Sequence, residues 1–163
     1  MKKQKSKFAK VLIANRGEIA LRAVKTARKL GLQSVAIYST ADKSSQHVIQ
    51  ADEAICIGPA PSSKSYLVKN AIIHTALGLS CDAIYPGYGF LSENAEFVDL
   101  CEANDIKFIG PVAESIREMG DKSTARKLAV TNNVPVVPGS DDAYDSEEEA
   151  LLAAKFIDYP LLL

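Results

Sequence analysis

The sequence has few residues of the kinds that form disulfides or hold metal ions. Its three cysteines, Cys56, Cys81 and Cys101, are widely spaced and include no Cys-x-x-Cys pair, so neither a disulfide framework nor a zinc site is expected. We expect reduced thiols in a protein core. The two histidines, His47 and His74, are too far apart for a local metal motif, and His74 lies among apolar residues that suggest the core or its edge. No Ser-His-Asp, Cys-His or metal constellation is found, so no catalytic or metal-binding residue is assigned.

Strong net charge and long apolar runs are also missing. The formal net charge is −1, which disfavours binding to nucleic acid or to anionic lipid. No run approaches the roughly 18 apolar residues of a transmembrane helix. The Lys-rich start resembles the first part of a signal peptide, but Lys10, Asn15 and Arg16 interrupt the apolar stretch that should follow. We therefore expect a cytoplasmic globular protein without a membrane partner.

Strand-like and helix-like segments alternate over the first two-thirds of the chain, as expected for βαβ units around a parallel sheet. Gly31 is expected to end the first helix and Ser92 to cap the third. Apolar runs predict strands at 10–14, 33–39, 53–58, within 81–87 and at 106–110, and helical periodicity predicts helices at 17–30, 66–77 and about 93–103.

The later part of the chain changes to shorter helical patterns. Residues 111–133 contain two of them, and residues 134–140 predict a proline-containing extended connector. Ser146 and Glu149 form a capping box that predicts a last helix through Phe156. The apolar residues at the end are expected to enter another buried strand, which indicates a chain cut short inside a larger protein. The alternative is a true terminal strand at the edge of the sheet.

The stretch KVLIANRGEIALRA, residues 10–23, begins like a nucleotide-binding βα unit. A dinucleotide fingerprint needs three glycines and a later acidic residue, but only Gly17 is present. Arg16 and Glu18 would crowd or repel a diphosphate, although the helix N-terminus still offers free amides. The pattern therefore favours a charged turn at the mouth of a parallel sheet over a phosphate site.

The stretch MGDKST, residues 119–124, has the residue types of a phosphate loop without their spacing. Asp121 separates the glycine from the lysine, and position 115 is serine where a P-loop has glycine. On its own the stretch predicts a helix start capped by Asp121 or Ser123.

The stretch YPGYGFLSEN, residues 85–94, follows a predicted strand. Gly87 and Gly89 permit backbone angles closed to other residues, and Tyr88 and Phe90 offer aromatic surface. Ligands of open α/β sheets bind at such strand ends. Local features leave a ligand-binding loop and a purely structural loop equally open.

Five stretches occur together and in order: IANRGEIALR, ADEAICIGPAPSSKSYL, AIYPGYGFLSENAEF, FIGP and MGDK. From about Lys10 to Pro160 the chain resembles the N-terminal region of biotin carboxylase, the ATP-dependent component of acetyl-CoA carboxylase. Related subunits occur in pyruvate, propionyl-CoA and methylcrotonyl-CoA carboxylases. The resemblance implies an α/β fold in which residues 1–110 form a Rossmann-like parallel sheet flanked by helices. Residues 111–163 would then be a short helical extension that begins a truncated ATP-grasp module.

The resemblance also implies a function and site residues. Biotin carboxylases are ligases that use ATP and Mg²⁺ to activate bicarbonate and then carboxylate biotin on a biotin carboxyl carrier protein or domain. Matching positions place Lys122 near the ATP phosphates, Tyr88 and Gly89 on the biotin side of the cleft, and Arg22 and Lys25 on a dimer-facing helix. The bacterial acetyl-CoA carboxylase of fatty acid synthesis is the expected parent.

In the family, the glycine-rich lid, the metal-binding glutamates and the arginine that faces biotin come later in the sequence. The resemblance therefore implies that these 163 residues alone are inactive and bind neither ATP, Mg²⁺ nor biotin tightly. Two alternatives are a stand-alone module that binds a nucleotide or small anion, and an oligomerisation module built on the basic helix 17–30.

Overall fold

A computed structural model describes residues 8–137 and 144–155, and its centre is a parallel β-sheet. β1 pairs with β2 on one side and with β4 on the other. The strand order β3-β2-β1-β4-β5 therefore changes direction at β1. The strands are β1 (Lys10–Ile13), β2 (Gln33–Ser39), β3 (Glu53–Gly58), β4 (Ala83–Tyr85) and β5 (Lys107–Phe108). The α/β class and the parallel sheet predicted from the alternating pattern are confirmed.

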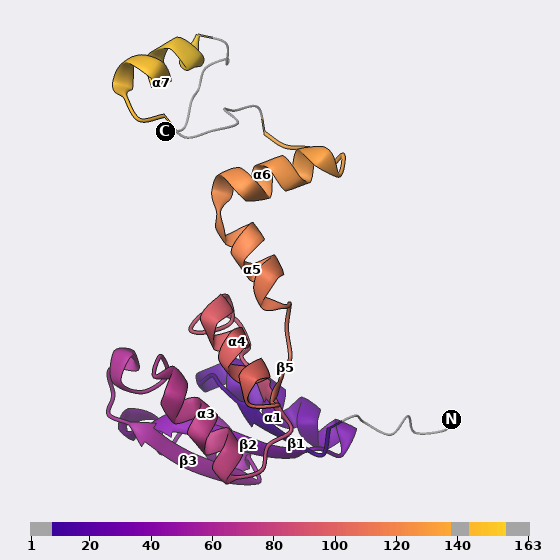
Figure 1. The fold of residues 1–163 in the computed structure, drawn as a ribbon. Helices are drawn as coiled ribbons and strands as arrows, with labels where there is room; N and C mark the ends of the chain where they lie inside the picture. The colour runs from indigo at the N-terminus through magenta and orange to yellow at the C-terminus, as the bar shows by residue number, and fades with distance from the viewer. Residues whose placement is uncertain (1–7, 138–143, 156–163) are drawn as a thin grey trace. The chain divides into compact units, whose positions relative to one another are not determined.

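Helices follow the strands closely. Figure 1 shows α3 (Lys69–Gly78) and α4 (Ala95–Ala103) lying across the sheet. α1 (Gly17–Leu30) has the predicted bounds and ends at Gly31, whose φ of 74° is left-handed and whose N–H donates to the Ala27 and Arg28 carbonyls. α2 (Gln46–Gln50) and the 3₁₀ turns η1 (Thr40–Asp42) and η2 (Ser62–Lys64) were not predicted, because one turn is too short to show a helical period.

Two predicted helix starts are wrong by a few residues. α3 begins at Lys69 rather than at Tyr66, because Tyr66 is fully buried in the core immediately after η2. α4 is capped by Asn94, whose side chain accepts a hydrogen bond from the Phe97 N–H at 2.9 Å. Ser92 is instead in the preceding turn, where its N–H donates to the Gly89 carbonyl at 2.9 Å.

The sheet is buried on both faces. Alternate β1 residues point to opposite sides, as the pleat requires. Val11 and Ile13 pack in clusters with residues of α1, and Leu12 packs in the large cluster with residues of α3 and α4. In that cluster Phe97 of α4 meets Phe108 of β5 edge to face, with ring centroids 6.1 Å apart. The sheet therefore has hydrophobic core residues on each of its faces.

The predicted burial of the cysteines and histidines is only partly confirmed. Cys81 and Cys101 are buried free thiols, but Cys56 is exposed. His74 is exposed, so its predicted place in the core or at its edge is wrong. His47 is buried instead, at 1% exposure. The reason is position on the helix: Ile72, Ile73 and Ala76 form the buried face of α3, and His74 lies on the other face.

The described residues from 117 onward belong to a second unit of the chain. α5 (Ala113–Gly120) begins in the first unit, where Ala113 is buried in the large core cluster. α6 (Lys122–Thr131) is capped by Asp121, which accepts from the Thr124 N–H at 2.7 Å, and α7 (Glu147–Ala154) is capped by Ser146. The two helical patterns and the predicted Ser146 cap are confirmed.

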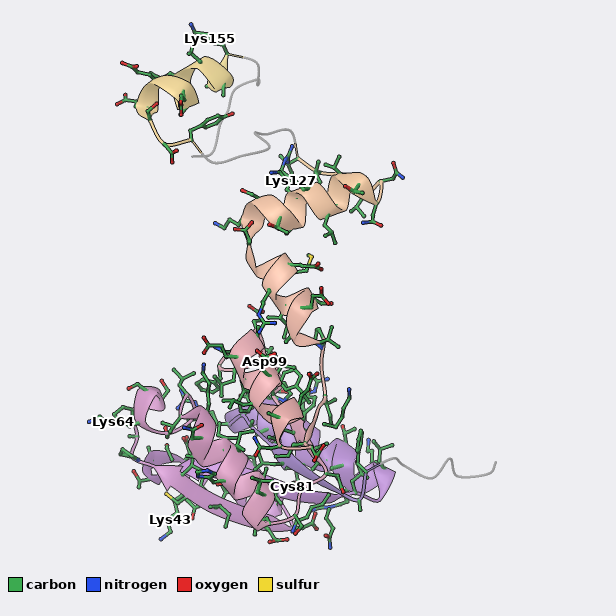
Figure 2. All side chains as sticks on the ribbon, viewed as in Figure 1. Lys43, Lys64, Cys81, Asp99, Lys127 and Lys155 are labelled. Atoms are coloured by element: carbon green, nitrogen blue, oxygen red, sulfur yellow. The ribbon has the colours of Figure 1, made fainter. Side chains whose placement is uncertain are left out.

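Among the residues that the structure describes, α6 and α7 have no buried member. Figure 2 shows side chains projecting from both helices in several directions, including Lys127. The predicted helix end at Phe156 and the strand expected after Pro160 lie outside the described residues. None of the described helices combines the length and apolar character needed to cross a membrane.

Candidate functional site

The candidate site lies at the carboxyl ends of β1 and β4, where the strand order changes direction. In open parallel sheets ligands bind in the crevice at this point. The structure has an open hollow here of about 470 Å³, lined by the turn at residues 15–19 and by residues 88–90. Loop 86–90, the segment that follows β4, therefore contributes one wall of the hollow.

Asn15 links the turn at residues 15–19 to loop 86–90. Its side chain is 1% exposed. The Nδ2 amide donates to the Pro86 carbonyl at 2.7 Å and to the Tyr88 carbonyl at 2.9 Å, and Oδ1 accepts from the Arg16 N–H at 2.9 Å. These bonds use both amide hydrogens and the oxygen, as a buried amide requires.

Loop 86–90 has an unusual backbone. Gly87 and Gly89 both have φ of 69°, and Phe90 has φ of 45°. A left-handed phenylalanine costs about 1–3 kcal/mol and persists only when its surroundings hold it. A Cβ on Gly87 would lie 2.9 Å from Asn15 Nδ2, whereas one on Gly89 would meet nothing within 4 Å. Gly87 therefore packs on Asn15, while Gly89 and the 66% exposed Tyr88 face the hollow.

Phe90 is held by aromatic and cationic neighbours. Its ring stacks on Tyr66 with centroids 5.2 Å apart and an interplanar angle of 18°. The Arg16 guanidinium carbon lies 5.6 Å from the centroid of each ring. Since cation–π contacts stabilise by about 0.5–1 kcal/mol at exposed sites, Arg16 contributes to holding both rings beside the hollow.

A polar cluster lies beneath Arg16. The Tyr66 and Ser39 hydroxyls each donate to Asp42 Oδ2 at 2.7 Å, and the Ser39 N–H donates to the Tyr66 oxygen at 2.9 Å. Arg16 Nη1 lies 3.8 Å from the same carboxylate oxygen. The cluster therefore joins the end of β2 to the turn after β1.

The protonation states of this cluster follow from its contacts. Burial alone would raise the pKa of Asp42, but hydrogen bonds from Ser39 and Tyr66 and the Arg16 charge outweigh it, so the pKa is lowered. Burial and the bond to Asp42 raise the pKa of Tyr66 to about 12. At neutral pH the cluster thus contains a carboxylate and a neutral phenol, and its physical role is to fix Arg16 and Tyr66.

The residues singled out from the sequence fall into separate groups. Tyr88 and Gly89 line the hollow. Arg22 and Lys25 are exposed on α1, where Arg22 Nε lies 3.9 Å from Glu18 Oε1. Lys122 is exposed as the first residue of α6, in the second unit. No group of three or more metal-ligating side chains occurs among the described residues.

Sequence reasoning missed Asn15, Asp42 and Tyr66 as parts of this site. Asn15 and its acceptor Pro86 are 71 residues apart, and no local pattern reveals such a contact. One available signal was the position of Asn15 next to a buried apolar strand, where a polar side chain needs specific partners.

The profile of the family described as "Biotin carboxylase, N-terminal domain" matches residues 7–116. The chain is 53% identical over 154 residues to biotin carboxylase 2, chloroplastic, of Populus trichocarpa, covering 94% of this chain and 29% of that protein. It thus spans between 21% and 35% of the length of the relatives it matches.

Solved structures give the same relationship. A biotin carboxylase from Campylobacter jejuni, described as a complex with β,γ-ATP, has a TM-score of 0.91 at 50% identity, covering 94% of this chain and 34% of that one. The biotin carboxylase domain dimer of Hydrogenobacter thermophilus 2-oxoglutarate carboxylase, described with MgADP, ADP and bicarbonate, has a TM-score of 0.89 at 47% identity, covering 94% and 34%. The chain belongs to the biotin carboxylase family, of which it carries the N-terminal domain.

Proposed function

We propose that the whole protein carrying this chain is an ATP- and bicarbonate-dependent ligase that carboxylates biotin on a carrier protein or domain. The observation that carries the proposal is the 47% identity, over 94% of this chain, to a domain whose structure is described with MgADP and bicarbonate. Bound ATP with Mg²⁺ would supply the phosphoryl group that activates bicarbonate. The acetyl-CoA carboxylase of fatty acid synthesis is the proposed parent.

Within that enzyme we assign Tyr88 and Gly89 to the biotin side of the cleft. The assignment is supported by the hollow that both residues line at the switch point of the sheet. Tyr88 is 66% exposed, so its ring is available to an apolar ring such as that of biotin. The open space beside Gly89 allows a ligand to approach the backbone closely.

We assign Lys122 to the ATP phosphates, and residues 111–163 to the beginning of the ATP-grasp module. Lys122 is an exposed cation in the first turn of α6, and a lysine ammonium binds phosphate oxygens through charge-assisted hydrogen bonds. The Mg²⁺ ligands and the lid are assigned, on family resemblance, to the rest of the enzyme. We place the boundary between the Rossmann-like domain and this module between residues 110 and 111.

We assign the exposed side of α1, with Arg22 and Lys25, to a homodimer interface of the whole enzyme. An apolar cavity of about 290 Å³ beside α1 supports this assignment, with Arg22 and Leu30 among its lining residues. Leu30 is 65% exposed, and burying such a side chain stabilises an interface by about 1.5–3 kcal/mol. The H. thermophilus structure is described as a dimer. We propose a cytoplasmic location for this protein, whereas the poplar relative is named as chloroplastic.

The function is tested by measuring ADP release with bicarbonate and free biotin. We expect biotin-dependent ADP release from the whole protein and none above background from the 163-residue chain. The Lys122→Met variant of the whole protein should raise the KM for ATP at least about tenfold, because one charge-assisted phosphate contact is lost, and leave the KM for biotin unchanged.

Lys64→Met is the matched control, since Lys64 is also an exposed lysine but is not assigned to the site. Bicarbonate-dependent ADP release by the 163-residue chain alone would contradict the proposal that catalysis requires the rest of the enzyme. A micromolar Kd of that chain for ATP would instead favour a stand-alone nucleotide-binding module.

A further inference from the structure

We propose that Asn15 is the positioning residue that holds loop 86–90 in the shape that presents Tyr88 and Gly89 to biotin. The inference rests on the proposed function for the assignment of these two residues to biotin. Asn15 itself bonds to the loop backbone, so its effect on the reaction acts through the loop.

Loop 86–90 requires an external restraint. Three of its five residues, Gly87, Gly89 and Phe90, have left-handed φ angles, and two of these are glycines, which have many alternative conformations. A backbone of this kind keeps one shape only if its surroundings determine it. The Phe90 ring is restrained by Tyr66 and Arg16, but these contacts act on one end of the loop.

Asn15 supplies the restraint at the other end. The two carbonyls that it binds, those of Pro86 and Tyr88, lie on either side of Gly87. One Nδ2 group thereby fixes the orientation of the Pro86–Gly87 and Tyr88–Gly89 peptide units, each of which precedes a left-handed glycine. A Cβ at position 87 would lie 2.7 Å from Ile19 Cγ2 and 2.9 Å from Asn15 Nδ2, so only a glycine fits there without displacing a neighbour.

The chemistry of the contact is specific to an asparagine side chain. Two carbonyl acceptors need two N–H donors on one atom, and the Arg16 N–H needs an acceptor on the same side chain. An aspartate keeps the acceptor but turns a negative oxygen toward two carbonyl oxygens. A glutamine adds a methylene where the site is 1% exposed and closely packed.

Asp82 offers a matched control at the opposite end of the same strand pair. Its Oδ2 accepts from the Ala9 and Lys10 N–H groups, each at 2.8 Å, so it bridges the amino ends of β1 and β4 as Asn15 bridges their carboxyl ends. Asn15→Asp and Asp82→Asn each exchange amide and carboxylate: the first removes two donated bonds, and the second keeps an acceptor oxygen for both N–H groups but removes its charge.

The first measurement is amide hydrogen exchange in the 163-residue chain, which does not depend on the function. The Ser92 N–H donates to the Gly89 carbonyl and reports on the shape of the loop. We expect Asn15→Asp to speed exchange of the Ser92 amide about tenfold or more relative to core amides of β2. Asp82→Asn should leave the Ser92 rate within about twofold of the original. A tenfold change corresponds to the loss of about one hydrogen bond. Asn15→Ser, which keeps a small polar side chain, serves if Asn15→Asp does not fold.

The second measurement is steady-state kinetics of the whole enzyme with free biotin. We expect Asn15→Asp to raise the KM for biotin about tenfold while the KM for ATP stays within about twofold, and Asp82→Asn to change neither. A general loss of stability would not separate the two KM values in this way.

The outcomes distinguish this inference from the proposed function. Unchanged Ser92 exchange in both Asn15 variants overturns the inference and leaves the proposed function standing. Faster exchange with an unchanged KM for biotin overturns the assignment of Tyr88 and Gly89 to biotin, and the inference with it. Faster exchange together with the selective rise in KM supports both.

Discussion

At the scale of single residues, the site depends on buried polar groups that form hydrogen bonds with one another. Asp42 accepts hydrogen bonds from Tyr66 and Ser39, and Arg16 adds a charge of opposite sign. If one member is removed, its partners stay buried without a hydrogen bond, which lowers the free energy of unfolding by about 1–3 kcal/mol. His47 is the exception in this region, because neither ring nitrogen has a well-formed hydrogen bond.

We predict that His47 makes the stability of the chain depend on pH below 6.5. Burial lowers the pKa of His47 from its ordinary 6.5, with Ile37 and Asp42 opposing in part. Below pH 6.5 the unfolded chain therefore takes up a proton that the folded chain does not. The free energy of unfolding should fall with decreasing pH, by up to about 1.4 kcal/mol per pH unit, until the folded pKa is reached.

Urea unfolding between pH 5 and 7 measures this effect, above the range where the carboxylates titrate. His47→Gln should flatten the profile, and His74→Gln, at an exposed position, should keep the slope of the original chain. Equal slopes for His47→Gln and the original chain would show that His47 is not the titrating group.

These two histidines illustrate the limit of prediction from residues. His74 has apolar neighbours in sequence yet is exposed, and His47 directly follows the polar stretch 42–46 yet is buried. Burial depends on which face of a helix meets the sheet, and a five-residue helix such as α2 is too short to reveal its face. Tyr88 and Gly89 could be selected because their glycine-rich loop is a local pattern, whereas the partners Asn15 and Asp42 come from distant segments.

At the scale of elements, the start of α4 shows how a tight turn displaces a helix cap. The Ser92 N–H is already bonded within the glycine-rich turn, so the helix begins two residues later than a first polar residue suggests. Asn94 then caps the Phe97 N–H.

We predict that Asn94→Ala lowers the free energy of unfolding by about 1 kcal/mol, the usual contribution of an asparagine cap. Ser92→Ala should change it by no more than about 0.5 kcal/mol. Chemical denaturation of both variants at pH 7 measures the difference. If Ser92→Ala lowered the free energy of unfolding more than Asn94→Ala, Ser92 and not Asn94 would be the cap of α4.

Elements with strong local signals were predicted well. The strands at 33–39 and 53–58 and the helix at 17–30 have the predicted bounds, because β-branched runs and a complete amphipathic period determine them locally. β4 and β5 are shorter than the apolar runs that contain them. Pairing with neighbours decides where a parallel strand ends, and this information lies outside the strand itself.

At the scale of the whole molecule, the first unit has core residues on each face of the sheet and an open hollow at the carboxyl ends of β1 and β4. β1 is central to this arrangement, since it pairs with β2 and β4 and leads directly into Asn15. The second unit has no buried side chain in α6 or α7 among the described residues. The positions assigned to biotin and to ATP thus belong to units of very different internal packing.

The unequal burial of the three thiols has a practical consequence. Burial raises the pKa of Cys81 to about 11 and that of Cys101 to about 12, whereas Cys56 is exposed on β3. We predict that a maleimide reagent at pH 7 alkylates one thiol per folded chain and all three in denaturant, because only accessible thiolates react. Mass spectrometry counts the adducts, and two or more on the folded chain would contradict the buried cores. A single probe could thus be attached to β3 without introducing any mutation.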